Sequence, residues 1–353
     1  MFANSTSSHV NDYYTWQAES IAVLYQILIP ILWIILTVAF VGNATVLASY
    51  RYLARPVSAN LKLCISLAAA DAWAALLLGV GLLVNSYLPV VLGYGDLPHL
   101  QCYILFLEMV RLGSMLTSEL HLFVVAINHC IGVCWPLKHK LVVTPRVVRW
   151  ALVCLWLLPH LSVSVIFTSL PSQGLLVAGC RADFYVQLPF RLAVFVVFAV
   201  PVAVTMALYA LMLNRLQATG GEKQRSRTIR TTLLIAGSFS AAWLPVVSLF
   251  VLVCVDGCPI EYMVDVDGLT LTVLGACFNS MVVLKLLTNP CLYALRMPVV
   301  RRAMLDCALV TTRRETVGTL RHKRSSSSLH HRQLSVTLSR AKLSAARLDS
   351  SAL

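Results

Sequence analysis

The stretch Asn289-Pro290-Cys291-Leu292-Tyr293 closes the last of seven long apolar segments of the chain. A proline inside a membrane helix removes one backbone hydrogen bond, and neighbouring polar side chains or water must then satisfy the freed carbonyl. With an asparagine directly before the proline and a tyrosine one turn after it, the stretch predicts a hinge that can repack.

A second proline-containing stretch, residues 239–245 (Phe-Ser-Ala-Ala-Trp-Leu-Pro), interrupts the sixth apolar segment. Apolar runs of at least ~18 residues are read as membrane helices. The chain is 58% hydrophobic and only 12% charged, and on this criterion it contains seven spans, at 25–50, 60–88, 102–134, 148–170, 189–214, 229–254 and 266–294. Because no internal repeat is evident, we expect one all-α membrane domain, a seven-transmembrane helix bundle.

The spans divide the chain into four parts. They are an extracellular N-terminus (1–24), the transmembrane bundle (25–295), an amphipathic juxtamembrane helix (296–310) and a disordered cytoplasmic tail (311–353) that is basic and rich in serine. Most of the 28 Lys and Arg residues fall in the tail or near the loops after spans one, three and five. By the positive-inside rule the N-terminus is therefore expected outside and the tail inside, in a multi-pass plasma-membrane protein.

The net charge of +13 favours attraction to anionic inner-leaflet lipid. Nucleic-acid binding is not expected, because no basic residues interleave with aromatic ones on a folded face. The N-terminus has no basic region or small-residue cleavage site, so we expect the first span to serve as an uncleaved signal anchor.

Four of the eleven cysteines fall on the side expected to be extracellular, where disulfides persist. A Cys102–Cys180 bridge would tie the longest outer loop over the mouth of the bundle, and Cys254 with Cys258 would close a small ring between spans six and seven. Asn4 begins the one sequon expected to be accessible to glycosylation.

Several landmarks occur in order on these spans: Gly42-Asn43, Leu67 followed by Asp71, Trp156, Pro201 with Tyr209, and the two proline hinges. Together they resemble a rhodopsin-like (class A) G-protein-coupled receptor over roughly residues 25–310. The resemblance implies an extracellular ligand, a heterotrimeric G protein as partner, and a sixth helix that swings outward on activation. It also implies arrestin and receptor kinases as further partners. The implied switch residues are Pro201, Tyr209, Phe239, Trp243, Pro245, Asn289, Pro290 and Tyr293.

Asp71 is the carboxylate that, in relatives of this kind, holds a sodium ion with Ser118 and an asparagine of span seven. Here Lys285 stands at the asparagine position. Because an intramembrane cation is costly unless it is paired, we expect a Lys285–Asp71 ion pair in place of the sodium site. The alternative is that Lys285 faces elsewhere or is neutral. Opsins place their retinal lysine two residues earlier, about 200° away around the helix, so retinal binding is not expected.

Arg111 lies where receptors for biogenic amines place the aspartate that binds the ligand ammonium, so a monoamine ligand is not expected. Glu108 lies one turn away, at a spacing that lets the two side chains meet. Either Arg111 receives a carboxylate or phosphate of a small-molecule, lipid or peptide ligand, or the two residues form an internal pair. Trp243 and Asn279 complete the expected ligand contacts. Glu119 carries no assigned role.

Asn128-His129-Cys130 replaces the Asp-Arg-Tyr of most relatives at the expected G-protein face, and Arg225 stands where an acidic partner is usual. These changes predict weakened or non-standard coupling, because histidine is shorter than arginine and mostly neutral in the cytosol. Cys307 is a candidate for palmitoylation. The serines that follow basic residues are candidates for phosphorylation: Ser325, Ser326, Ser327, Ser328 and Ser335.

Two other classes of function compete with the receptor. A transporter, or a seven-helix protein that does not signal, could also carry polar groups inside its spans. Transporters usually contain repeats with paired broken helices, and none is evident here. No nucleophile motif, phosphate loop or metal-ligand cluster occurs in the sequence, so an enzyme, a cofactor and a metal site are not expected.

Overall fold

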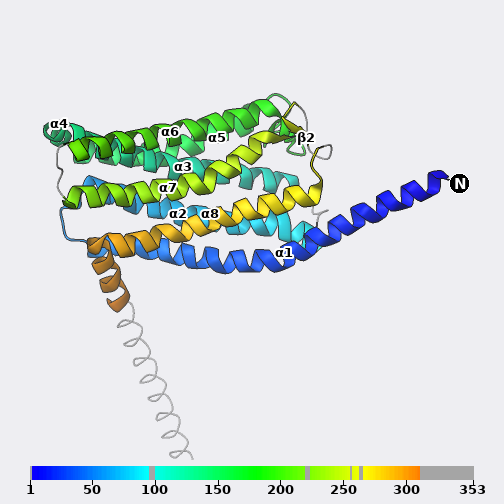
Figure 1. Ribbon diagram of the computed structural model, residues 1–353, viewed down its shortest axis with the longest axis horizontal. Coiled ribbons are helices and arrows are strands. Elements are labelled where there is room, and N and C mark those ends of the chain that lie inside the picture. Colours follow the sequence, from blue (N-terminus) through cyan, green and yellow to red (C-terminus); the bar gives the residue numbers. More distant parts are fainter. Residues whose placement is uncertain (1, 95–99, 219–222, 255–256, 262–264, 311–353) are drawn as a thin grey trace, which may run out of the picture.

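The computed structural model describes residues 2–94, 100–218, 223–254, 257–261 and 265–310 (Figure 1). Within these ranges it describes all side chains apart from those of residues 2–14, 216–218, 223–232, 235, 239 and 296. Seven long helices lie side by side, and they are α1 (Phe2–Ser49), α2 (Ala59–Leu82), α3 (Leu100–Cys134), α5 (Pro145–Ser169), α6 (Leu188–Ala218), α7 (Lys223–Leu252) and α8 (Gly268–Arg296).

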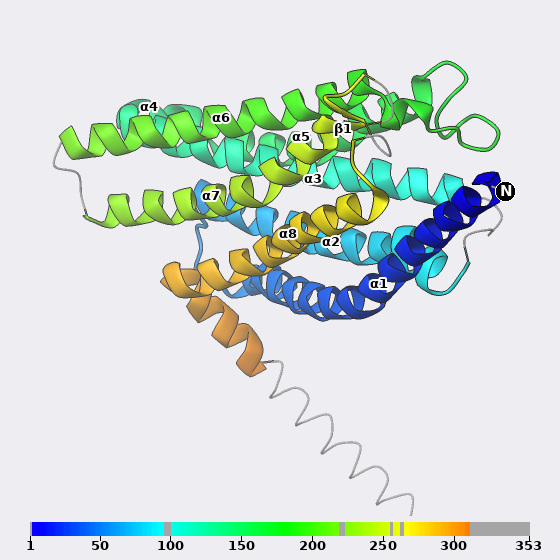
Figure 2. The same ribbon diagram turned by 45° about the vertical axis from the view of Figure 1, so that its right-hand side comes forward.

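Short elements connect the long helices. They are the 3-10 turns η1 (Tyr50–Tyr52) and η3 (Asp183–Val186), the π-helical turn η2 (Leu83–Val91), the helix α4 (Pro136–Val142), and the strands β1 (Val253–Cys254) and β2 (Ile260–Glu261). The two strands pair in parallel, with Val253 opposite Ile260. A last helix spans residues 298–310 and runs across the direction of the bundle (Figure 2).

Six of the long helices are long and apolar enough to cross a membrane, among the residues described. The exception is α7, which carries the expected sixth span and whose apolar part, Ala236–Leu252, is shorter. All the same, α7 packs between α6 and α8 along the bundle, so the chain forms the expected all-α seven-helix bundle.

Two elements differ from the sequence expectation. Helix α1 begins at Phe2 rather than near residue 25, and its first part projects beyond the bundle (Figure 1). No proline or glycine occurs between Phe2 and Pro30, so nothing in this stretch ends a helix. The second span, expected to be one continuous helix, instead ends in the π-helical η2, which contains Pro89. A proline cannot donate the hydrogen bond that a regular α-helix needs at that point.

Helix α3 lies at the centre and packs against α2, α5, α6 and α7, while α1 packs against α2 and α8. A close approach between α1 and α8 occurs at Gly42, where an added Cβ would lie 3.1 Å from Cγ of Pro290. Gly42 therefore lets α1 contact α8 at its proline, and this contact helps to position the buried polar groups around it.

Both disulfides, Cys102–Cys180 and Cys254–Cys258, lie at one end of the bundle, called the disulfide end below. The Cα atoms of the first pair are 5.1 Å apart and those of the second pair 5.6 Å, so the structure joins the cysteines as the sequence suggested. The first bridge fastens the loop that contains η3 to the start of α3. Helix α4 and the helix 298–310 lie at the opposite end (Figure 1).

Candidate functional site

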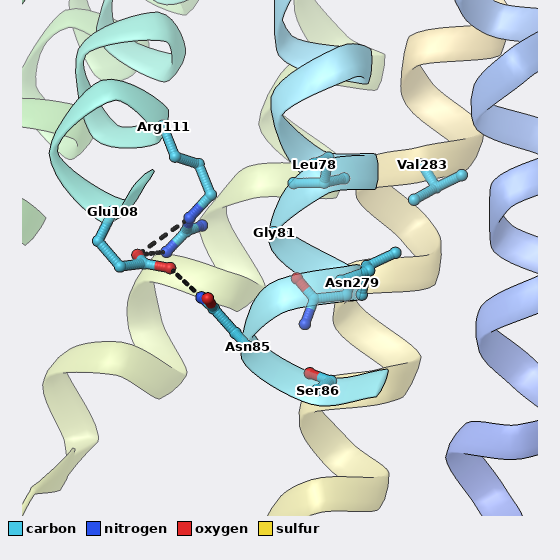
Figure 3. A pocket seen from close by; sticks show the side chains of 9 residues that line it. Leu78, Gly81, Asn85, Ser86, Glu108, Arg111, Asn279 and Val283 are labelled. Atoms are coloured by element: carbon cyan, nitrogen blue, oxygen red, sulfur yellow. Dashed lines mark hydrogen bonds and ion pairs between the residues drawn. The ribbon is translucent and has the colours of Figure 1, made fainter. Parts of the chain in front are cut away.

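A cluster of four polar side chains lies among the helices toward the disulfide end, and Figure 3 shows three of them, Glu108, Arg111 and Asn85. Glu108 Oε2 accepts hydrogen bonds from Arg111 Nε at 3.0 Å and from Arg111 Nη2. It also accepts one from the Tyr185 hydroxyl at 2.8 Å, while Oε1 accepts one from Asn85 Nδ2 at 3.0 Å. These four residues, called the Glu108 cluster below, connect α3, η2 and η3.

In this cluster both oxygens of the Glu108 carboxylate accept hydrogen bonds, whereas one nitrogen of the Arg111 guanidinium has only a weak acceptor. Burial and the neighbouring Glu108 carboxylate raise the pKa of Tyr185, so its hydroxyl remains protonated and donates. Arg111 Nη1, by contrast, contacts only the Met115 sulfur, at 3.7 Å, among its hydrogen bonds. A thioether is a weak acceptor, so this nitrogen retains most of its capacity to donate to another group.

Two cavities adjoin Arg111. The first, of about 150 Å³, is lined by Asn85, Ser86, Glu108, Asn279 and apolar residues of α2 and α8 (Figure 3). The second, of about 460 Å³, lies toward α6 and α7, and Arg111 and Asn279 line it together with apolar side chains of α7 and α8. Two of the expected ligand contacts, Arg111 and Asn279, therefore line the same two cavities. Trp243, also expected there, is buried in the core and lines neither cavity.

Arg191 also lines the larger cavity. Its Nε donates to the Tyr185 carbonyl at 3.1 Å, and its Nη1 donates to the carbonyls of Phe250, at 2.9 Å, and Val253. The guanidinium carbon lies 4.5 Å from the centre of the Phe250 ring. Arg191 forms no ion pair with a described carboxylate, so the cavity carries a positive charge that Glu108 does not neutralise.

The central charged pair lies deeper in the bundle. Lys285 Nζ is 2.9 Å from Asp71 Oδ1, and the two side chains are 2% and 0% exposed, so they meet without solvent. Ser118 Oγ donates to the same oxygen at 3.4 Å, and Asn289 Nδ2 donates to Asp71 Oδ2. Lys285 therefore pairs with Asp71 as the sequence predicted, and Ser118 and Asn289 bind the same carboxylate.

The proline hinge of α8 also has its missing hydrogen bond replaced. Pro290 cannot donate to the Leu286 carbonyl, and Asn43 Nδ2 of α1 donates to that carbonyl instead, at 3.1 Å. The sequence predicted that some polar group would do this but did not identify Asn43. Of the other switch residues, Tyr209 and Tyr293 are buried, and Pro201 and Pro245 lie inside α6 and α7. The side chain of Phe239 lies outside those described.

The Asn128-His129-Cys130 triplet lies at the end of α3 away from the disulfides. Asn128 Oδ1 is 3.1 Å from His139 Nε2 of α4, and the His129 ring lies edge-on to Tyr209 with centroids 6.3 Å apart. Both ring nitrogens of His129 are buried, and neither has a hydrogen-bond partner among the described residues. The side chain of Arg225 is not among those described, so its expected position opposite His129 stays a prediction.

The structure contains a second polar network that the sequence did not predict. The Trp156 indole donates to Ser66 Oγ at 3.0 Å, this oxygen lies 2.8 Å from His121 Nε2, and His121 Nδ1 lies 2.7 Å from the Thr117 carbonyl. The signal that could have found it is the position of His121, one turn after Ser118 on the buried face of α3. Glu119 is also buried, and within the described part of the chain neither of its oxygens has a hydrogen-bond partner.

The remaining candidate residues lie away from these sites. Asn4 lies in α1 and Cys307 in the helix 298–310. The five candidate phosphorylation sites, Ser325, Ser326, Ser327, Ser328 and Ser335, lie outside the described residues. Glycosylation, palmitoylation and phosphorylation of these residues stay predictions.

A family model described as "7 transmembrane receptor (rhodopsin family)" matches residues 42–293. The match begins at Gly42 of α1, ends at Tyr293 of α8, and includes all or part of each of the seven long helices. It therefore contains the Glu108 cluster, the Lys285–Asp71 pair and both proline hinges.

Proposed function

Because the chain belongs to the rhodopsin family of seven-transmembrane receptors, we propose that it binds an anionic ligand beside Arg111 and transmits this binding to a heterotrimeric G protein. The chain is a class A receptor of the plasma membrane rather than an enzyme, and the family implies an extracellular ligand and a G protein as partners. The disulfide end faces outward in this proposal, as the distribution of Lys and Arg along the sequence favours.

The observation that carries the ligand proposal is the charge around the larger cavity. Arg111 keeps Nη1 available, Arg191 has no carboxylate partner among the described residues, and Asn279 adds a neutral amide. A carboxylate or phosphate would complement these groups through charge-assisted hydrogen bonds. A protonated amine would be repelled, which argues against dopamine, octopamine and serotonin as ligands.

The test is an activation assay that covers every G-protein class and arrestin, carried out first without ligand and then with libraries of anionic and of cationic small molecules. We expect activators among the anions alone, with responses lost in Arg111→Gln at matched surface expression. Potent activation by a monoamine would contradict the ligand proposal. Ion flux through the purified protein without a G protein would favour a transporter.

We further propose that coupling to the G protein is weak because His129 offers fewer hydrogen-bond donors than an arginine would at that face. Its ring packs against Tyr209, and its nitrogens are buried. A guanidinium has five N–H donors on a long chain, whereas an imidazole has at most two. The residue at this position therefore offers the G protein few directed contacts.

Substituting His129→Arg, alone and with Asn128→Asp, is expected to raise G-protein activation at matched surface expression. Asp at position 128 keeps an oxygen that can accept from His139, so the contact with α4 is retained. The measurement is nucleotide exchange by each G-protein class in membranes from cells that express equal receptor. Strong signalling by the unmodified chain that both substitutions leave unchanged or reduce would count against the proposal.

We also propose that the Lys285–Asp71 pair makes the receptor insensitive to sodium. Asp71, Ser118 and Asn289 supply the oxygens and the amide around this position, and the ammonium of Lys285 fills it. Because the amine is covalently tethered, a change in sodium concentration outside the cell cannot alter the occupancy of this site.

A further inference from the structure

A third cavity, of about 290 Å³, lies between α1, α2 and α8 near the disulfide end. Its wall is mostly apolar, with Leu28, Ile29 and Leu32 of α1 facing Leu271 and Ala276 of α8. Its polar lining groups are the hydroxyls of Tyr25, Ser86 and Thr272 and the amide of Asn279, and none of the described residues that line it is charged.

This cavity adjoins the two beside Arg111, because it shares lining residues with both of them. Asn279 lines all three cavities. Leu82 and Ser86 line the third cavity and also the one at the Glu108 cluster. Leu271 and Gly275 line the third cavity and also the one at Arg191. Together the three volumes fall within the range of about 300–1,000 Å³ that is typical of small-molecule sites.

Glycines leave space at the junction where the cavities adjoin. A Cβ atom added to Gly275 would meet no heavy atom within 4 Å, and the same holds for Gly81, which lines the cavity at the Glu108 cluster. The Asn279 amide has no hydrogen-bond partner among the described side chains and borders each of the three volumes, so it is available to a molecule that passes the junction.

The three adjoining cavities are thus cationic at one end and lined mainly by uncharged, largely aliphatic residues at the other. Arg111 and Arg191 line the first part, whereas leucine, isoleucine and alanine side chains line the part between α1 and α8. A peptide would leave its backbone amides unsatisfied in the apolar part. A hydrocarbon chain would bury apolar surface there, and removing each methylene from water is favourable.

We infer that the three cavities together form one site for a single-chain lipid with an anionic head group. The head binds Arg111 and Asn279, and the tail lies between α1, α2 and α8. This inference rests on the proposed function in placing the ligand beside Arg111, and it adds the chemical class of the ligand and the position of its tail. The head can be the carboxylate of a fatty acid or the phosphate of a lysophosphatidate.

The test uses the unmodified full chain in nanodiscs of neutral phosphatidylcholine. Two probes are used, oleate and oleoyl lysophosphatidate, each with a photoreactive diazirine near the end of the tail, and peptide mapping locates the labelled residues. We expect one or both probes to label residues 25–32 and 268–279 and to be displaced by the unlabelled lipid. The preferred probe identifies the head group. Equal labelling by oleyl alcohol with the same diazirine, or labelling confined to other helices, would overturn the inference.

Two substitutions at one position complete the test. Gly275→Phe places a ring in the junction and is expected to weaken probe binding by about tenfold or more, since losing the burial of about two methylenes already has that effect. Gly275→Ala is the matched control and should bind as the unmodified chain does, because its Cβ has open space. Unchanged binding by Gly275→Phe would also overturn the inference.

The outcomes separate this inference from the proposed function. Labelling of α1 and α8 without activation of any G protein would support the lipid site and count against signalling. Activation by an anion that depends on Arg111 but is indifferent to Gly275→Phe, with no labelling of α1 or α8, would support the receptor proposal and reject the lipid tail position.

Discussion

Asp71→Asn is expected to lower the free energy of unfolding by about 3–5 kcal/mol, the cost typical of removing one partner of a buried pair. The Lys285 ammonium, 2% exposed, would then lie in the bundle without its carboxylate. Most of the protein should fail to reach the cell surface. The measurements are surface immunolabelling of intact cells and thermal unfolding of the purified protein.

Two control variants distinguish the charge from the packing. Replacing both partners with apolar residues, as in Asp71→Leu with Lys285→Met, should recover much of the lost stability, because no unpaired charge remains. Lys285→Asn should leave Asp71, Ser118 and Asn289 free to bind sodium, so its melting temperature should rise in sodium chloride relative to equal potassium chloride. If the unmodified receptor itself responds to sodium but not to potassium, the pairing does not replace the sodium site.

Glu108→Gln is expected to have the second largest effect, with opposite signs for stability and for ligand binding. The side chains of Arg111 and Glu108 are 24% and 14% exposed, between the surface and the buried case. We therefore expect a loss of about 1–3 kcal/mol in the free energy of unfolding. Because Arg111 is then no longer neutralised, an anionic probe such as oleate should bind about tenfold more tightly, a difference of about 1.4 kcal/mol.

Asp183→Asn is the matched control for this charge change. Asp183 Oδ2 lies 2.7 Å from Arg181 Nη2 near the same end of the bundle, but both side chains are more than half exposed, so its loss should change stability little. The measurements are thermal unfolding with and without oleate, and equilibrium binding of radiolabelled oleate. An unchanged or lower affinity of Glu108→Gln for oleate would mean that Glu108 and Arg111 form only an internal ion pair and that the cluster does not bind the ligand.

The parts of the site that carry charge could be predicted from the sequence. A membrane interior excludes unpaired charges, so Lys285 required a carboxylate, and the resemblance to class A receptors indicated Asp71 as that partner. Arg111 and Glu108 lie one turn apart on the same helix, so their meeting depended only on helical spacing. The cysteine pairs followed from their positions at one end of the bundle.

The neutral partners could not be predicted, because their contacts join helices that are distant in sequence. Asn43 reaches Leu286 only because Gly42 lets α1 approach Pro290 closely. Asn85 reaches Glu108 from the π-helical η2, whose altered winding an apolar pattern does not reveal, and Tyr185 reaches it from a loop. The start of α1 was also misplaced, because hydropathy indicates where a membrane span begins and not where a helix begins.

The covalent tether of the Lys285 ammonium has an electrical consequence. A free ion that enters or leaves a deep site moves through the membrane field, and a full crossing changes its energy by about 2.3 kcal/mol per 100 mV. The positive charge beside Asp71 is instead the Lys285 ammonium, which is fixed in α8 and does not move through the membrane field while the ion pair is formed. In an excitable cell, a depolarisation would therefore neither empty nor fill this site.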